Sequence, residues 1–372
     1  MTSDETPLRV LARPAFENRR ENPYNWLLYS GLRARGVTVD EFGAKNLLLG
    51  RYDICHVHWP ESTFNASLFE ALTTTRALLH SLDWLTVRKT KLLWTAHNLR
   101  AHERRFSQAE EAFWAEFVAR LDGFIALSQA SLELTRQRFP ELEKKPAFVV
   151  PHPHYRGQYP DGVARSQARA RLGLAQDARV VLFFGRILEY KNVPALIRSV
   201  RALRRQPGGA DVVALIAGRP HDRAIAEAVK RAAGTDPGVA LHLSFVSQKD
   251  AQFYFRAADL VALPYREILN SGSAVLALGF DRPVLMPRKG AGEELARSIG
   301  GDWVQLYDEL LPEAIGGALT RSAALPPVTD GRQLAPLDPA AAVSRTLEAY
   351  RSLLRPAPPR GASLPVPVGA YP

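Results

Sequence analysis

The chain has 372 residues, of which 46% are hydrophobic and 23% are charged. That composition is typical of a folded protein and excludes a chain that is disordered throughout, and the length is typical of two domains. The 48 Lys and Arg residues exceed the 38 Asp and Glu residues, so the formal net charge is +10. Such an excess indicates a phosphorylated or polyanionic partner, or an anionic membrane surface.

Cys55 is the one cysteine of the sequence, which excludes an internal disulfide and a cysteine-based zinc site. The first residues are polar and acidic where a signal peptide would be basic and then apolar. No apolar run approaches the ~20 residues that cross a bilayer. We therefore expect a cytoplasmic protein whose contact with a membrane is peripheral.

Short apolar runs alternate with helical patterns in the first half, which is typical of a parallel sheet covered by helices. The predicted strands are Leu8–Leu11, Ile54–His58, Lys91–Thr95, Gly123–Leu127 and Ala147–Val150. The predicted helices are Pro23–Arg35, Ser67–Leu82, Glu110–Leu121 and Gln129–Arg138. Ligands of open parallel sheets bind beyond the carboxyl ends of the strands, so a site is expected in the loops that follow them.

Histidines and carboxylates follow two of these strands: His56, His58, Glu61, His97, His102 and Glu103. His56 and His58 share one face of their strand, and neighbouring parallel strands end at the same edge of a sheet. Histidine and carboxylate are the usual proton acceptors for an attacking hydroxyl, so this rim is a candidate acid–base site. Two alternatives stay open. One is a metal site, although the spacing is not that of a zinc-binding helix, and the other is a structural role, which we expect of His56 and His152.

Residues 76–91 combine several leucines and Trp84 with Arg88, Lys89 and Lys91. An apolar helix with a basic end can lie on an anionic membrane. Most amphipathic helices instead bury their apolar face in their own domain, and that alternative is favoured here.

Residues 151–162 carry three prolines and two glycines without hydrophobic periodicity, which predicts an interdomain linker. The alternation then resumes, with strands predicted at Val180–Phe184, Val212–Ala217, Ala240–Phe245, Leu260–Leu263, Val284–Met286 and Trp303–Leu306. Helices are predicted at Val193–Arg204, Asp222–Ala233, Lys249–Ala257, Ser273–Gly279 and Pro339–Leu354. Residues 355–372 hold six prolines and are predicted to be disordered, with a proline-rich docking segment as the alternative.

Two segments of the second half indicate an anion site. Gly185 ends a strand and is followed by Arg186 and Lys191, two cations that can neutralise a pyrophosphate leaving group. Ser271-Gly272-Ser273 opens an apolar helix, where backbone N–H groups and the helix dipole suit a diphosphate. The alternatives are solvated loop charges for the first segment and ordinary N-cap residues for the second.

The second half resembles the GT-B class of nucleotide-sugar glycosyltransferases in the order of its strands, its loop with Lys191 and its phosphate loop near residue 270. More narrowly, residues 20–310 resemble glycosyltransferase family 94, typified by a GDP-mannose-dependent mannosyltransferase of xanthan assembly. The strings that carry this likeness are Asn22-Pro-Tyr24, Arg51–Glu61, His97–Glu103, Tyr190-Lys191, Leu263-Pro-Tyr265, Asn270-Ser-Gly272 and Arg282–Leu285. No Walker loop, G-x-G-x-x-G, G-x-S-x-G or kinase signature is present, which disfavours an NTPase, a dehydrogenase and a hydrolase.

The resemblance implies an α/β protein with the GT-B fold, in which two Rossmann-like domains face each other across a cleft. Residues 1–160 would bind the acceptor, 165–325 would bind the nucleotide-sugar donor, and the helix at 339–354 would pack back on the first domain. The implied reaction moves a sugar, mannose from GDP-mannose in the type member, to a polyprenyl-diphosphate-linked or other glycan acceptor in exopolysaccharide assembly. The family is taken to invert the anomeric configuration.

On this interpretation Glu61, His97 and Glu103 are alternative bases for the acceptor hydroxyl. The acceptor side would consist of Asn22, Tyr24, His58, Trp59 and His102. The donor side would consist of Gly185, Arg186, Lys191, Tyr265, Asn270, Ser271, Gly272 and Ser273. No cofactor and no metal are expected, because no Asp-x-Asp motif is evident and the cations and the helix start can take the place of a metal ion.

The sequence departs from the wider GT-B class at two positions. Val275 stands where many retaining enzymes have a second glutamate eight residues after the one that Glu267 matches, and Asn192 replaces a glycine after the loop lysine. Three rival functions stay open: a GT-B transferase with a UDP- or dTDP-sugar donor, a GT-B epimerase or phosphorylase, and a non-catalytic phosphate- or nucleic-acid-binding α/β protein. Nucleic acid is the disfavoured partner, because it leaves the histidines and carboxylates of the rim unexplained.

Overall fold

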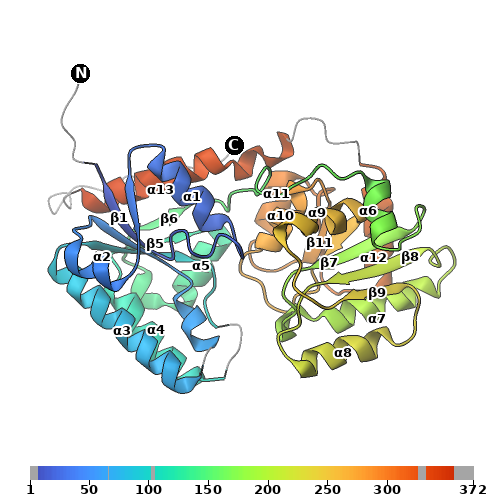
Figure 1. Ribbon diagram of the computed structural model, residues 1–372, viewed down its shortest axis with the longest axis horizontal. Coiled ribbons are helices and arrows are strands. Elements are labelled where there is room, and N and C mark those ends of the chain that lie inside the picture. The colour runs from blue at the N-terminus through green and yellow to red at the C-terminus, as the bar shows by residue number, and fades with distance from the viewer. Residues whose placement is uncertain (1–6, 66, 102–104, 326–331, 356–372) are drawn as a thin grey trace.

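The computed structural model describes residues 7–65, 67–101, 105–325 and 332–355. These residues form two six-stranded sheets, and every strand pairs with its neighbours in parallel. The sheets lie side by side along the long axis of the molecule, each between layers of helices (Figure 1). The predicted tail at 355–372 lies almost entirely outside the described residues.

The first sheet has the strand order β2-β1-β3-β4-β5-β6. Its strands are β1 (Arg9–Arg13), β2 (Thr38–Glu41), β3 (Ile54–His58), β4 (Lys91–Ala96), β5 (Gly123–Ala126) and β6 (Ala147–Val149). The central strands are continuous buried runs because helices cover both faces of a parallel sheet. In the pairing of β3 with β4, His58 lies opposite Thr95, so the segments after both strands leave the sheet at one edge.

The second sheet has the strand order β12-β11-β10-β7-β8-β9. Its strands are β7 (Arg179–Phe184), β8 (Val212–Ala217), β9 (Val239–His242), β10 (Leu260–Ala262), β11 (Val284–Pro287) and β12 (Val304–Tyr307). The chain order reverses direction between β7 and β10, which lie side by side at the centre. Parallel sheets bind their ligands at such a switch point, and the loops with Lys191 and Ser271 follow these two strands.

Five helices belong to the first half: α1 (Tyr24–Arg33), α2 (Ala44–Leu49), α3 (Leu68–Val87), α4 (Ser107–Arg120) and α5 (Gln129–Arg138). The second half adds α6 (Arg165–Arg171), α7 (Val193–Arg204), α8 (Arg223–Ala233), α9 (Gln248–Ala257), α10 (Gly272–Gly279), α11 (Gly292–Ile299), α12 (Pro312–Ala323) and α13 (Pro339–Leu354). Short 3₁₀ helices span Pro60–Asn65, Pro140–Leu142, Glu189–Lys191 and Arg332–Leu337. Side chains cap several of these helices, as Ser67 and Glu70 do at α3 and Asp222 does at α8.

The structure differs from the predicted elements mainly at the sheet edges. Strand β2 was not predicted, because Val39 is its one fully buried residue and an edge strand needs no apolar run. Strand β9, also an edge strand, ends at His242 and not at Phe245, which is exposed. The sequence also gave no signal for α2, α6, α11 and α12, which are short, polar or interrupted by glycines.

Helix α13 returns to the first half of the chain and lies along α1 (Figure 1). The Tyr350 hydroxyl on α13 hydrogen-bonds to Nδ1 of His56 on β3, at 2.8 Å. Arg35, just after α1, donates to Oγ of Ser344 at 2.6 Å. The first sheet is thus covered in part by the last described helix of the chain.

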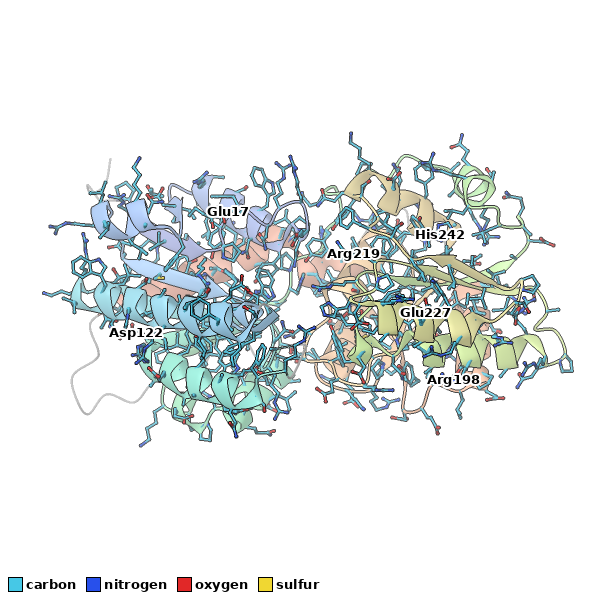
Figure 2. The ribbon with its side chains drawn as sticks, turned by 60° about the horizontal axis from the view of Figure 1, so that its bottom comes forward. Glu17, Asp122, Arg198, Arg219, Glu227 and His242 are labelled. Atoms are coloured by element: carbon cyan, nitrogen blue, oxygen red, sulfur yellow. The ribbon has the colours of Figure 1, made fainter. Side chains whose placement is uncertain are left out.

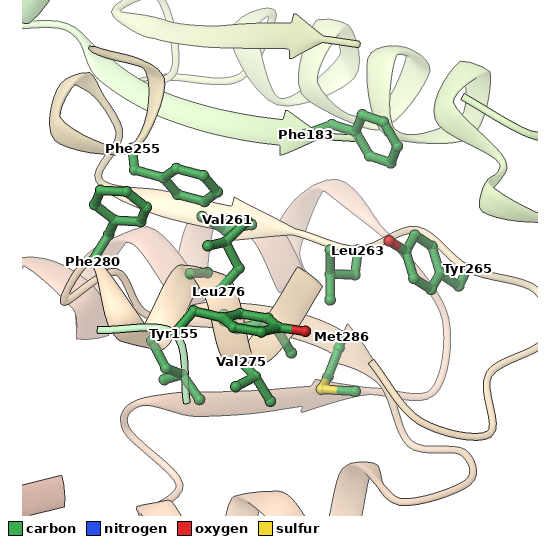
Figure 3. Close-up of a cluster of buried hydrophobic side chains, with 14 of the residues drawn as sticks. Tyr155, Phe183, Phe255, Val261, Leu263, Tyr265, Val275, Leu276, Phe280 and Met286 are labelled. Atoms are coloured by element: carbon green, nitrogen blue, oxygen red, sulfur yellow. The ribbon is translucent and has the colours of Figure 1, made fainter. Parts of the chain in front are cut away.

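The linker is anchored in the second domain by Tyr155. Figure 3 shows the Tyr155 ring among the apolar side chains of that domain, close to Val275 of α10 and Met286 of β11. The ring is buried, and its hydroxyl donates to Oδ1 of Asn22 in the first domain at 2.9 Å. The linker therefore touches both domains at the point where the two sheets face each other.

Candidate active site

The edge where β3 and β4 end brings three of the predicted histidines together. His56 and His58 lie on β3, and His97 follows β4. Their rings are buried, with centroids 4.2 Å apart for His56 and His58 and 5.2 Å apart for His58 and His97. The alternation of β3 and the register of β4 together account for this cluster.

Hydrogen bonds fix each imidazole of this cluster. His58 bonds through Nε2 to the Tyr29 hydroxyl at 2.6 Å and through Nδ1 to Nε2 of His97 at 2.9 Å. His56 bonds to the hydroxyls of Tyr350 and Thr95, at 2.8 and 2.7 Å. Because both nitrogens of His56 are engaged in the interior, that residue has the contacts of a structural histidine.

Burial keeps these histidines neutral. It lowers the pKa of His56 to about 3, and it lowers the pKa of both His58 and His97 well below the ordinary value. Trp59 stacks on His97 with ring centroids 4.0 Å apart, and it adopts a left-handed φ of 46° to do so. A bulky residue rarely adopts that backbone conformation, which marks the rim as a constrained part of the chain.

Glu61 lies behind the same rim and is 3% exposed. Its Oε1 accepts a hydrogen bond from Nδ2 of Asn98 at 2.8 Å, whereas its buried Oε2 has no partner among the described residues. Burial raises the pKa of Glu61 to about 7, against the opposing hydrogen bond from Asn98 and the charge of Arg13. A carboxyl group with that pKa is suited to accept a proton near neutral pH.

Tyr24 and Asn22 support the rim from α1. The Asn22 side-chain oxygen accepts from the Tyr24 backbone N–H at 3.0 Å, just before the helix. The buried Tyr24 ring meets His97 and His152 edge-on, with centroids 4.8 and 5.0 Å apart. The remaining two predicted residues of this side, His102 and Glu103, lie outside the described residues.

Lys191 lies in the second domain and is 9% exposed. A Cβ placed on Gly185 would lie 3.8 Å from the Lys191 ammonium and 4.0 Å from Oγ of Ser273, so both groups surround Gly185. The ammonium lies 5.4 Å from the centre of the Tyr265 ring, and no described residue forms a hydrogen bond or ion pair with it. Burial, together with the charge of Arg186, lowers the pKa of Lys191 to about 8.

Helix α10 begins beside Lys191. Oγ of Ser271 accepts from the Ala274 backbone N–H at 3.1 Å, so Ser271 is the N-cap that the sequence left as an alternative. Gly272 and Ser273 belong to the first turn of the helix. The backbone N–H groups of a first turn have no carbonyl acceptor within the helix. Asn270 lies 3.5 Å from the carbonyl oxygen of Ala96 across the domain boundary.

Arg186 directly follows Gly185 in this domain and lines a second space. Its guanidinium donates to Nδ1 of His221 at 2.5 Å, and both residues line a cavity of about 440 Å³. Arg219, seen in Figure 2 on the side of the second domain that faces the first, lines this cavity together with Phe245. The sequence did not indicate Arg219, because a lone arginine after a strand is an ordinary solvated residue.

A larger cavity of about 990 Å³ is lined by both domains. Its walls include the arginines Arg100, Arg105, Arg138 and Arg266, together with Asn98, Tyr190, Tyr265 and Asn270. Glu61 and His97 do not line it, but Asn98, which binds Glu61, does. Sequence patterns missed Arg105 and Arg138 because charged residues of this kind occur on any solvated helix or loop.

Helix α3 buries Leu78, Leu79, Leu82 and Leu85 in the first domain, which is the core-facing alternative favoured above. Its outer side nevertheless exposes large apolar residues, among them Phe69 at 76% and Val87 at 78%. Within the described ranges no helix is long and apolar enough to cross a membrane. Nor do the described residues contain a group of three or more His, Cys, Asp or Glu side chains that could hold a metal ion.

Comparison with known proteins finds relatives that share part or most of this chain. Residues 178–319 match the family described as glycosyl transferases group 1. Over 326 residues the chain is 29% identical to the GDP-mannose:glycolipid 4-beta-D-mannosyltransferase of Xanthomonas campestris pv. campestris, covering 86% of this chain and 85% of that protein. A shorter match, 33% identical over 182 residues, relates 47% of the chain to 37% of the D-inositol 3-phosphate glycosyltransferase of Streptomyces griseus subsp. griseus.

Solved structures show the same fold at low sequence identity. Anabaena Alr3699/HepE in complex with UDP and glucose has a TM-score of 0.62 and 16% identity, over 92% of this chain and 99% of that one. Sucrose-phosphate synthase from Thermosynechococcus elongatus has a TM-score of 0.61 and 15% identity, over 94% and 96% of the two chains. The GT-B fold expected from the sequence is confirmed, and the matched domain at residues 178–319 together with the curated relatives supports a glycosyltransferase.

Proposed function

We propose that this protein is a glycosyltransferase that moves mannose from GDP-mannose to a glycolipid, a lipid-diphosphate-linked oligosaccharide used in exopolysaccharide assembly. The likeness to a GDP-mannose:glycolipid mannosyltransferase supports this substrate class, since it extends over 86% of the chain at 29% identity. In this proposal the second domain holds the nucleotide sugar and the first holds the acceptor.

The observation that carries the proposal is the Lys191 side chain, which is 9% exposed and forms no hydrogen bond or ion pair with a described residue. Burying a cation is unfavourable unless an anion compensates it, so the site is suited to an anionic ligand. The start of α10 supplies N–H groups next to the same space, at Gly272 and Ser273. A diphosphate fits both features, and its charge increases as the sugar leaves it.

We propose that transfer inverts the anomeric carbon. The acceptor hydroxyl then attacks from the side opposite the diphosphate and gives its proton to a base. Glu61 is the preferred base, because its pKa of about 7 and its unpaired Oε2 suit a proton acceptor. Access from the larger cavity would pass Asn98, and His97 and Glu103 remain the alternative bases.

The proposed reaction uses no metal ion, because Lys191 and the start of α10 stabilise the leaving diphosphate. Transfer is therefore expected to continue in the presence of EDTA. A loss of activity in EDTA that Mg²⁺ or Mn²⁺ restores would contradict this part of the proposal.

We also propose that the outer side of α3 and the neighbouring α2 rest on the membrane that carries the acceptor. Leu48, Leu49, Trp84 and Val87 are exposed there. Lys45, Arg51, Arg88 and Lys89 add positive charge close to them in the chain. An apolar surface with basic residues binds anionic lipid through both contributions.

A direct test measures release of the nucleoside diphosphate from GDP-mannose, UDP-glucose and dTDP-glucose, with and without a polyprenyl-diphosphate oligosaccharide. Acceptor-dependent release of GDP, with a sugar added to the lipid, is expected. Product without an acceptor would indicate an epimerase, and product that requires inorganic phosphate would indicate a phosphorylase. Binding of DNA or RNA in place of any nucleotide sugar would overturn the proposal.

A further inference from the structure

His152, on the linker, lies between the start of α10 and the rim of the first domain. A Cβ on Gly272 would be 3.5 Å from Nε2 of His152 and 3.6 Å from the hydroxyl of Tyr155. The opposite side of the imidazole meets the Tyr24 ring. His152 is buried, so the contacts seen here determine its protonation.

When the imidazole of His152 is neutral, its contact with the Tyr155 hydroxyl has no hydrogen to share. Its Nδ1 lies 2.9 Å from the Pro153 carbonyl oxygen, which only accepts, so the hydrogen of a neutral ring is on Nδ1. Nε2 is then an acceptor, 3.2 Å from the Tyr155 hydroxyl. That hydroxyl has a single hydrogen and a second, closer acceptor in Oδ1 of Asn22 at 2.9 Å.

The orientation of Asn22 removes the other way to satisfy this network. Its Oδ1 also accepts from the Tyr24 backbone N–H, so turning the amide over would bring two donors together. Tyr155 therefore donates to Asn22, and two lone pairs face each other between Tyr155 and His152. A proton on Nε2 would complete the chain of donors from His152 through Tyr155 to Asn22.

We propose that His152 takes up a proton when the donor diphosphate binds and stabilises it by its charge, an inference that rests on the proposed function. When a diphosphate binds at the start of α10, Nε2 takes up a proton from the solvent. When the diphosphate leaves, the proton returns to the solvent. The imidazolium stabilises the diphosphate by its charge, and it also completes the hydrogen bonds that join the linker to the first domain.

The surroundings of His152 explain why the proton arrives only with the ligand. Burial lowers the pKa of His152 to about 4, so the unliganded side chain is neutral at pH 6. Among the described residues, the titratable groups that face it are Tyr24 of α1, His97 after β4 and Tyr155 of the linker, and none of them is an anion near neutral pH. The first turn of α10 adds Gly272 and Ser273, which carry no charge.

A diphosphate at the start of α10 would thus be the first anion near this imidazole. Nearby negative charge in a water-poor site raises the pKa of a histidine. The sign of the pH dependence follows from this rise. Binding is strengthened at low pH and loses that gain as the pH rises through the pKa of His152 in the complex.

Calorimetric titration of the full chain with GDP at pH 6, in two buffers of different ionisation enthalpy, measures the protons taken up per GDP bound. The wild type should take up more protons than His152→Gln, by about half a proton to one proton per site. The protons that belong to the phosphate groups of GDP cancel in this difference. His154→Gln is the matched control, because its side chain faces Arg156 and Asp338 instead of α10, and it should match the wild type.

Gly272→Ala gives a second variant, should His152→Gln fail to fold. Its methyl group fits at ordinary contact distance but lies between His152 and the ligand, so proton uptake should fall while α10 is retained. Equal proton uptake by the wild type and the folded variant would overturn the role of His152 and leave the proposed function intact. Failure of GDP, UDP and dTDP to bind the wild type would overturn the proposed function itself, and this inference with it.

Discussion

Lys191 and Glu61 carry opposite charges, and burial moves their pKa values toward each other. The pKa of Lys191 falls to about 8 and that of Glu61 rises to about 7, because desolvation disfavours both charged forms. A bound diphosphate would reverse the shift at Lys191, whereas Glu61 remains ready to accept a proton. The two residues thus suit the two requirements of glycosyl transfer, charge stabilisation and deprotonation.

Replacing Lys191 tests the first requirement. In Lys191→Met the transfer rate should fall on the order of 100-fold or more, because the leaving diphosphate loses its buried cation. The fold should be retained, since removing a buried unpaired charge does not destabilise a protein. Steady-state release of GDP and the thermal midpoint measure the two effects.

The matched control is Lys230→Met, on α8, where the lysine is exposed and bonds to Glu227. This variant should keep the wild-type rate. Full activity in Lys191→Met would exclude the diphosphate site proposed around α10.

Replacing Glu61 tests the second requirement. If Glu61 is the base, kcat/KM of the wild type rises with pH through about 7 as the carboxyl ionises. Glu61→Gln should then lose on the order of 100-fold or more in rate and lose this pH dependence. An unchanged profile in Glu61→Gln would assign the role to His97 or Glu103.

The change in stability caused by Glu61→Gln should depend on pH. Because the pKa of Glu61 is higher in the folded chain than in the unfolded one, its contribution to stability is present at low pH and is lost as the pH rises through about 7. Glu61→Gln should therefore be more stable than the wild type at pH 8. Urea unfolding at pH 5 and pH 8 measures this difference, and no change in it would mean that Glu61 is not buried as described.

Among the helices, α3 and α10 differ in which part is exposed. Helix α10 is buried from Ala274 to Gly279, so only its first turn is available to a ligand. Helix α3 is capped at Ser67 and buries one face, but its other face leaves Phe69 and Val87 in solvent. An exposed apolar face of this kind marks an interaction surface.

Vesicle binding tests the surface on α2 and α3. The double variant Leu49→Glu/Val87→Glu should bind vesicles of anionic phospholipid at least about 10-fold more weakly than the wild type, because it removes apolar area and adds negative charge. Activity on a water-soluble acceptor analogue should not change. Leu311→Glu replaces an exposed leucine of the second domain and is the control.

For the whole molecule, the predicted order of strands and helices in both halves agrees with the structure, because parallel sheets are built from long apolar runs. The alternation of apolar and helical segments did not predict polar edge strands such as Thr38–Glu41, because such a strand forms by pairing with a single neighbouring strand. It placed His56, His58 and His97 together, because strand alternation and register determine their positions. It dismissed His152, since no local pattern reveals that a linker residue will face both domains.

The contact between α13 and the first sheet should contribute to global stability. Tyr350→Phe removes the hydroxyl that binds His56 and leaves a buried nitrogen unpaired, which should cost about 1–3 kcal/mol in the free energy of unfolding. Tyr254→Phe breaks a similar bond to His242 in a partly exposed site, so its effect should be smaller. Equal losses in urea unfolding would mean that α13 leaves His56 open to water.

Helix α13 also determines when the first domain can finish folding. Its Val343 lies so close to α1 that a side chain on Gly31 would collide with it, and its Tyr350 reaches into the first sheet. A ribosome makes that sheet before the second sheet and makes α13 after both. The first domain is therefore completed only after the second has been made, and a fragment that stops at the linker lacks part of its own interior.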